Sequence, residues 1–332
     1  MGAGRGLGGV LALLFIVAGG IGAVAWAWRD YNAPGPLTRT ETLVLPRGDT
    51  VAGLSQRLAQ VGIIAHPWLF VADLYLSGDA RALKAGEYRF AAAMSPAAIA
   101  RLLASGKVVE HRLTVPEGLT SGEVVAMVAA APALDGAVGT PPSEGSLLPD
   151  TYFFVRGDRR DALIARMRRA MSKTLAEAWA SRAPDVPLTA PADALVLASI
   201  VEKETAKAAE RPHIAGIYLN RMRLGMKLQA DPTVLYALTD HGAKPLGRPL
   251  DHDDLAVASP YNTYLHPGLP PGPIANPGKA ALLAAVRPEK TDDLYFVSDG
   301  SGAHNFARTL DQQNRNINTL RKQQATRPAE EK

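Results

Sequence analysis

The sequence contains no cysteine, and this absence excludes disulfides, thiolate metal sites and cysteine nucleophiles. An excess of one charge sign is also missing, because 36 basic residues face 32 acidic ones and leave a formal charge of +4. No basic stripe is interleaved with aromatic residues, so the sequence does not favour nucleic-acid binding. A chain without cysteine fits an oxidising compartment as well as the cytoplasm, and the compartment must therefore be inferred from another feature.

That feature is one long apolar run at residues 7–28, which carries no charged residue. As a helix its ~22 positions would span roughly 33 Å, enough to cross the core of a bilayer. Trp26 and Trp28 suit the membrane interface at its end. We expect a transmembrane helix that stays attached. The alternative is a cleaved signal peptide, because residues 23–25 read Ala-Val-Ala, but the run is longer than a usual signal-peptide core.

Residues 42–110 show the patterns of a small module with the order strand, helix, helix, strand. The first strand is predicted at 42–45 and the second, which alternates apolar and polar residues, at 86–90. Two helices are predicted between them, and a third begins at Ser95. This order and spacing resemble a LysM module. The alternative is an α+β support domain without a ligand.

Seven parts are expected along the whole chain. The expected parts are a cytoplasmic tail at 1–6, the transmembrane helix at 7–28, a linker at 29–41, the LysM-like module at 42–110, a connecting part of the catalytic region at 111–190, a catalytic core at 191–320 and a polar tail at 321–332. The predicted fold class is α+β, with a mixed α/β catalytic domain.

The most informative stretch is a predicted helix at 193–210. Leu197, Ile200 and Val201 form an apolar stripe at helical spacing, and Glu204 completes it at the next position of the same face. A carboxyl group held against an apolar face loses solvation when it ionises, which raises its pKa towards neutrality. Glu204 is therefore a candidate general acid. Glu202 is expected on the opposite side of the helix, and the alternative for Glu204 is an ordinary surface glutamate paired with a neighbouring lysine.

Several further motifs follow this helix and one precedes it. They read SIVEKET at 199–205, LQADPTVLY at 228–236, SPYNTY at 259–264, GLPPGPIANPG at 268–278, LYFV at 294–297 and PDTY at 149–152. Together they closely resemble the MltG (YceG-like) family of endolytic murein transglycosylases, over nearly the whole chain.

The resemblance implies an activity and a catalytic residue. Members of this family cut glycan strands internally between N-acetylmuramic acid and N-acetylglucosamine and leave a 1,6-anhydro end, so the enzyme is a lyase. The family's catalytic glutamate is the second one of the Glu-Lys-Glu run, which corresponds to Glu204. One carboxyl group can suffice, because the C6 hydroxyl of the sugar serves as the nucleophile. The expected location is the cytoplasmic membrane with the catalytic part outside, and cell-wall synthesis proteins are conceivable partners.

Sugar binding requires amides, hydroxyls and aromatic faces, and loop residues of these types are candidates. The candidate binding residues are Gln229, Tyr261, Asn262, Thr263, Tyr264, Asn276, Asn220 and Asp231. For each of them a structural role in a cap or turn is the alternative, and Asp231 before Pro232 suits a helix start. No cofactor or metal is expected, since the histidines lack the spacing of a metal-binding motif.

Two other functions fit the same residues. One is a glycoside hydrolase that pairs Glu204 with a second carboxylate, either Asp231 or Glu210. The other is a scaffold without activity that binds the cell wall through the module at 42–110.

Overall fold

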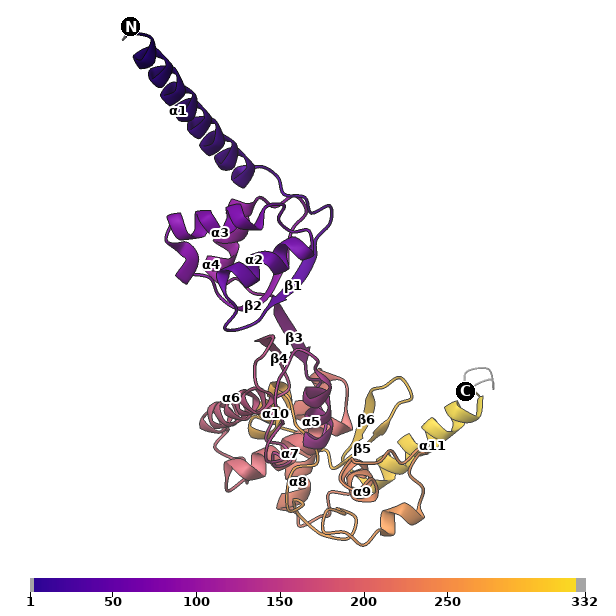
Figure 1. Cartoon of the computed structure of the whole chain (residues 1–332). Coiled ribbons are helices and arrows are strands. Elements are labelled where there is room, and N and C mark those ends of the chain that lie inside the picture. Colours follow the sequence, from indigo (N-terminus) through magenta and orange to yellow (C-terminus); the bar gives the residue numbers. More distant parts are fainter. Residues whose placement is uncertain (1–2, 327–332) are drawn as a thin grey trace. The chain divides into compact units, whose positions relative to one another are not determined.

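The computed structural model describes residues 3–326, with side chains from residue 9 to residue 325. The chain divides into two compact units. The N-terminal unit runs to His111 and includes Val155–Gly157, and the C-terminal unit comprises Arg112–Phe154 and the chain from Asp158 onward. Both units contain helices and short strands, which confirms a mixed fold (Figure 1).

The chain begins with a single long helix, α1 (Ala3–Asn32). Residues 9–32 of this helix are long and apolar enough to cross a membrane, and none of that stretch is buried against the protein. This confirms the predicted apolar helix. A signal sequence would have the same length and composition, so permanent anchoring belongs to the proposal below. Residues 1–2 of the predicted cytoplasmic tail lie outside the described residues.

The N-terminal unit continues with the predicted order of strands and helices. Its elements are β1 (Glu41–Leu45), α2 (Val51–Gln60), α3 (Pro67–Leu76), a 3-10 turn (Asp79–Arg81), β2 (Gly86–Phe90) and α4 (Pro96–Ser105). The antiparallel strands β1 and β2 pair Leu43 with Tyr88. The side chains of Thr50 and Ser95 accept hydrogen bonds from the first turns of α2 and α4, which fixes where these helices begin.

A separate hydrophobic core holds this unit together. Its largest buried side chains come from all the elements and include Leu58, Phe70, Tyr88 and Ile99. Tyr88 is fully buried, and its hydroxyl donates to the main-chain oxygen of Lys84 at 2.8 Å, so burial of this polar group is compensated. The unit therefore has the core of an independent module. Its likeness to LysM stays a prediction.

The C-terminal unit is mainly helical with small two-stranded sheets. Its elements are β3 (Glu110–Thr114), α5 (Ser121–Ala130), β4 (Thr151–Val155), α6 (Arg160–Ala180), α7 (Pro191–Glu204), a 3-10 turn (Ala208–Glu210), α8 (Arg211–Arg223), α9 (Asp231–Leu238), a 3-10 turn (Asp253–Ala256), α10 (Lys279–Val286), β5 (Tyr295–Ser298), β6 (His304–Ala307) and α11 (Leu310–Thr326). Strand β3 pairs with β4, and β5 forms an antiparallel hairpin with β6.

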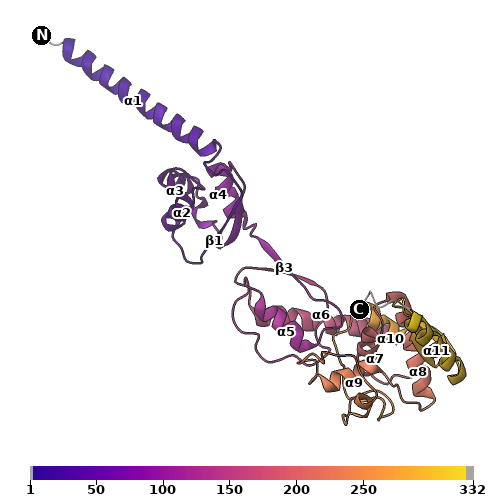
Figure 2. The same ribbon diagram turned by 90° about the vertical axis from the view of Figure 1, so that its right-hand side faces the viewer.

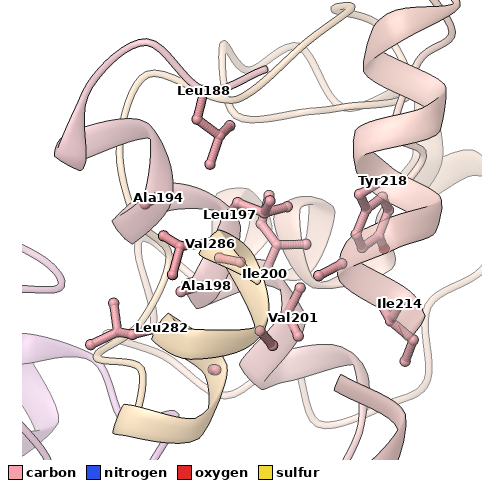
Figure 3. Close-up of a cluster of buried hydrophobic side chains, with 14 of the residues drawn as sticks. Leu188, Ala194, Leu197, Ala198, Ile200, Val201, Ile214, Tyr218, Leu282 and Val286 are labelled. Atoms are coloured by element: carbon pink, nitrogen blue, oxygen red, sulfur yellow. The ribbon is translucent and has the colours of Figure 1, made fainter. Parts of the chain in front are cut away.

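Helix α7 lies at the centre of the C-terminal unit. It packs against α8 and α10, and side chains from all three helices form one hydrophobic cluster (Figures 2 and 3). Leu197, Ile200 and Val201 of α7 are fully buried, but so are Ala198 and Ser199 on its other side. The helix is thus buried all round, and the apolar stripe in the sequence marks only one of its buried faces.

Two predicted boundaries differ from the structure. The helix predicted to reach Glu210 ends at Glu204, because Thr205 is extended with a φ of −141° and a 3-10 turn follows. At the other end of the chain, α11 extends through residues 321–326 of the predicted polar tail. The rest of that tail, residues 327–332, lies outside the described residues.

Candidate active site

Glu204 is the last residue of α7, at the point where the buried helix reaches the surface. The start of the helix is fixed by Pro191 in its first turn and by the Asp193 carboxylate, which accepts hydrogen bonds from the main-chain nitrogens of Thr189 and Ala190. Packing of the helix against α8 and α10 fixes its far end. The carboxyl group of Glu204 is therefore held by a rigid element rather than by a loop.

The Glu204 carboxyl group meets one donor from the neighbouring helix. The hydroxyl of Tyr218, on α8, donates a short hydrogen bond to Oε1. Burial raises the pKa of Glu204 to about 7, and the negative charge of Asp231 acts in the same direction. The Tyr218 hydrogen bond and the positive charge of Arg221 oppose the rise. Near neutral pH this carboxyl group can therefore exist in both the acid and the base form.

A cleft of about 360 Å³ opens beside Glu204. Its lining residues come from α7, α8, the segment before α9, the loop before α10 and the β5–β6 hairpin: Glu204, Arg221, Leu228, Gln229, Asp231, Tyr264, Phe296, Val297, Ser298 and His304. The lining combines carboxyl, amide, hydroxyl and aromatic groups. These groups are what a carbohydrate needs for its hydroxyls, its acetamido groups and the apolar faces of its rings.

Arg221 connects two walls of the cleft. Its Nε donates to the main-chain oxygen of Leu294 at 2.6 Å, just before β5, and an Nη donates to that of Leu228 at 2.7 Å. The side chain is almost fully buried, and its guanidinium also lies over the ring of Tyr295, 5.2 Å from the ring centroid. One buried cation thus sets the positions of the hairpin and of the segment that carries Gln229.

Three of the predicted binding residues lie in this cleft. Gln229 is exposed and has a positive φ of 52°, a conformation that is unusual outside glycine and that turns the chain into α9. Asp231 begins α9, and the hydroxyl of Tyr264 donates to its Oδ1 at 2.5 Å. The structure thus places Gln229, Asp231 and Tyr264 beside Glu204, and their binding role stays a prediction.

Three other predicted binders make hydrogen bonds within the protein. Asn262 is fully buried, donates to the main-chain oxygens of Leu255 and Val257 and accepts from the nitrogen of Tyr264. The Thr263 hydroxyl is hydrogen-bonded to the main chain of Ala230 and to Thr233. Asn276 is likewise fully buried and bonded to Leu119, Ser121 and Leu147. All three fix loops, and none has a free polar group to offer a sugar.

The last two predicted binders lie away from the cleft. The amide of Asn220 donates to the main-chain oxygens of Thr291 and Asp293 and lines a different, polar pocket. Tyr261 is partly exposed and packs with Tyr236 and His241, at centroid distances of 5.0 and 5.5 Å. Asn220 thus lines another pocket and Tyr261 belongs to a separate aromatic cluster, and their binding role stays a prediction.

Glu202 has a different set of partners from Glu204. It is buried, and Arg211 donates to its Oε1 at 2.6 Å while the main-chain nitrogen of Gly278 donates to Oε2 at 2.9 Å. Arg211 also contacts Glu117 at 3.0 Å. Both oxygens of Glu202 are thus occupied by structural partners, so this residue ties α7 to α8 and to the start of α10.

Several residues of the cleft were not predicted as site residues. They include Arg221 and His304, and Tyr218 contacts Glu204 from the neighbouring helix. Phe296 and Ser298 lie in a short strand that carried no chemical signal in the sequence. No group of three or more metal-ligating side chains occurs between residues 3 and 326.

Comparison with known proteins decides the family. The family model described as "YceG-like family" matches residues 43–319, most of the chain. The chain belongs to the YceG-like family. A crystal structure of a YceG-like protein from Listeria monocytogenes superposes with a TM-score of 0.52 at 30% identity, covering 84% of this chain and 99% of that protein.

Curated relatives carry a name that states an activity. An endolytic murein transglycosylase of Bacillus subtilis is 38% identical over 174 residues, which are 52% of this chain and 47% of that protein. An endolytic murein transglycosylase of Streptococcus pneumoniae serotype 2 is 29% identical over 324 residues, 83% of this chain and 57% of that protein. The chain spans about half the length of these relatives.

Proposed function

We propose that this YceG-like protein is an endolytic lytic transglycosylase of peptidoglycan, with Glu204 as its acid. The observation that carries the proposal is a carboxyl group fixed at the end of a buried helix, open to a polar and aromatic cleft, with a pKa raised to about 7. The names of the relatives from Bacillus subtilis and Streptococcus pneumoniae support the same activity.

The chemistry needs one proton to be delivered and one to be removed. Glu204 in its acid form protonates the glycosidic oxygen that leaves C1 of N-acetylmuramic acid. The C6 hydroxyl of the same sugar attacks C1, the C1–O6 bond forms, and the hydroxyl proton is lost to a base. In the simplest form of the mechanism that base is the Glu204 carboxylate itself. No water is consumed, and the product carries a 1,6-anhydro ring.

The other residues of the cleft have roles in holding the strand. Gln229 offers an amide to an acetamido group, while Tyr264 and Phe296 offer ring faces to a pyranose. Asp231 accepts the Tyr264 hydroxyl and so fixes that ring. Tyr218 keeps its proton, since burial holds its pKa well above the usual value, and it remains a donor to Glu204 throughout.

One observation favours a second candidate function. Asp231 is exposed in the same cleft as Glu204, and two carboxylates across a cleft are the arrangement of a glycoside hydrolase. The other carboxylate considered for this role, Glu210, is bonded to His304 and Thr205 and does not line the cleft. The hydrolase candidate therefore rests on Asp231 alone, and its product would end in a reducing sugar.

One experiment separates these functions. Purified glycan strands are incubated with residues 30–332 and the products are analysed by mass. We expect internal cleavage with 1,6-anhydro ends, and a loss of at least ~10²- to 10⁴-fold in Glu204→Gln, the usual effect of removing a general acid. Glu177→Gln, an exposed glutamate on α6, is the matched control. Reducing ends would establish the hydrolase, and binding without new ends would establish a scaffold.

The location of the enzyme follows from its substrate. We propose that α1 anchors the chain in the cytoplasmic membrane and that both units lie outside the cytoplasm, with the LysM-like N-terminal unit holding the strand. Cell-wall synthesis proteins would be neighbours there. Protease added to spheroplasts should digest the C-terminal unit while the membrane retains a fragment containing α1. Protection of the C-terminal unit, or release of the intact chain from the membrane, would contradict this topology.

A further inference from the structure

The β5–β6 hairpin brings a histidine to the cleft that contains Glu204. His304 is the first residue of β6, and its ring packs edge-on against Phe296 of β5, with the centroids 5.4 Å apart and the planes at 88°. Both residues line the cleft. The side chain of His304 is only 14% exposed, so its orientation is fixed by packing rather than left to solvent.

Glu210 determines which nitrogen of this ring carries the proton. Oε2 of Glu210 lies 2.8 Å from Nδ1 of His304, and Oε1 accepts the main-chain nitrogen of His304 at 3.1 Å. The hydroxyl of Thr205 also donates to Oε2, at 3.0 Å. Although burial raises the pKa of Glu210, the hydrogen bonds from His304 and Thr205 hold it below its usual value. An ionised carboxylate can only accept, so Nδ1 must be the protonated nitrogen.

This arrangement leaves Nε2 of the neutral ring with a free lone pair. Between residues 3 and 326 the structure gives Nε2 no hydrogen-bond partner, while Nδ1 is engaged by Glu210. A carboxylate behind a histidine also stabilises the imidazolium that forms when Nε2 accepts a proton. The pair His304–Glu210 therefore has the arrangement of a histidine base in the wall of the cleft that contains Glu204.

We propose that His304 is a second proton-transfer residue of the cleft and that Glu210 is its positioning residue. The inference rests on the function proposed above. Glu204 gives its proton to the leaving oxygen as the C1–O4 bond breaks. The C6 hydroxyl oxygen bonds to C1, and its proton passes to Nε2 of His304. After product release the imidazolium loses that proton to water and the Glu204 carboxylate regains one from water, which closes the cycle.

Assigning the two proton transfers to two residues removes a difficulty of the simplest mechanism. A single carboxyl group must be an acid for the leaving oxygen and a base for the C6 hydroxyl within one turnover. With two groups each is needed in only one form, Glu204 protonated and His304 neutral. The charged or titratable groups around these two side chains are Glu210, Tyr218, Arg221, Asp231 and Tyr264.

The test compares variants of His304 and Glu210 in the chain of residues 30–332. His304→Gln should lower kcat for anhydro-product formation by at least ~10²-fold, the scale of a lost general base, with strand binding and melting temperature near those of the parent. The matched control is His266→Gln, which changes an exposed histidine outside the cleft. Glu210→Gln should cause a smaller loss of kcat and move the acidic limb of the kcat profile against pH.

Imidazole rescue separates a proton-transfer role from a structural one. Added imidazole should restore part of the activity of His304→Ala, with a dependence on the fraction of neutral imidazole, and should leave Glu204→Gln inactive. Activity of His304→Gln within threefold of the parent would overturn the inference. So would a loss that imidazole does not relieve in a folded His304→Ala, or a loss that appears equally in strand binding. Absence of anhydro products from the parent chain would instead contradict the proposed function itself.

Discussion

The surroundings of Glu202 and Glu204 differ although the two residues stand two positions apart on the same helix. Glu202 is buried, and both its oxygens are bonded, to the Arg211 guanidinium and to the main-chain nitrogen of Gly278. Glu204 has no cationic hydrogen-bond partner, receives one hydrogen bond from Tyr218 and opens onto a cleft. A carboxylate with a complete set of partners holds structure together. One that lacks them keeps a labile proton and becomes available for chemistry.

The largest effect expected from this difference is on stability at Glu202. Glu202→Ala should lower the free energy of unfolding by about 3–5 kcal/mol, because removing one partner leaves the Arg211 charge buried and only Glu117 to compensate it. Urea unfolding followed by circular dichroism measures this change. Among the described residues the Arg211 Nε already has no hydrogen-bond partner, so no further partner compensates the guanidinium when Glu202 is removed.

The control for this prediction is Glu177→Ala, which removes an exposed carboxylate with a weak contact to Lys173. It should change the free energy of unfolding by less than about 1 kcal/mol. If Glu202→Ala unfolds at the same urea concentration as the control, then Glu202 is not the structural member of the pair and the comparison fails.

How far the sequence predicts this site depends on which contacts are local. The order of elements in the N-terminal unit and the helix that carries Glu204 follow from caps and spacing, which are local. The opposite roles of Glu202 and Glu204 depend on Arg211 and Gly278, which reach the helix only in the folded chain. The stripe pattern placed Glu204 and Glu202 on opposite sides of the helix, but it did not show that both sides are buried.

The loop residues show more clearly how far the sequence predicts the site. Asn262 and Asn276 have the composition of sugar-binding loop residues, yet both are fully buried because they satisfy main-chain groups of neighbouring loops. Gln229 belongs to the same class of side chain and is exposed in the cleft. Sequence composition does not distinguish these cases. His304 was overlooked because its partner, Glu210, is 94 residues away along the chain.

A second, smaller effect concerns stability as a function of pH at Glu204. In the folded protein its pKa is raised from 4.5 to about 7, so the folded state binds the proton more tightly than the unfolded chain does. The stabilisation is complete below pH 4.5 and is lost as pH rises through 7. Glu204→Gln does not ionise, and relative to the parent it should gain up to about 3 kcal/mol between these pH values.

Melting curves at pH 4.5, 6 and 8 measure this prediction. The difference in melting temperature between Glu204→Gln and the parent should grow with pH and level off above pH 8. The Glu177→Gln variant should show a difference that does not depend on pH. A constant or shrinking difference for Glu204→Gln would mean that burial does not raise the pKa of Glu204.

The smallest effect expected is a displacement of the pH profile when the Tyr218 hydroxyl is removed. This hydroxyl donates to Glu204 and so favours its ionised form, which lowers the pKa of the acid. In Tyr218→Phe the pKa of Glu204 should therefore rise. A hydrogen bond to a charged group contributes about 1.5–3 kcal/mol, so the alkaline limb of kcat/KM should move upward by about one to two pH units. The ring still packs edge-on against Phe296, at a centroid distance of 5.8 Å, so folding should be kept.

Tyr75→Phe, which alters an exposed tyrosine of the N-terminal unit, is the control and should leave the alkaline limb in place. A downward movement in Tyr218→Phe would show that the tyrosine stabilises the protonated acid, and its hydrogen bond would then add to the effect of burial on the pKa of Glu204.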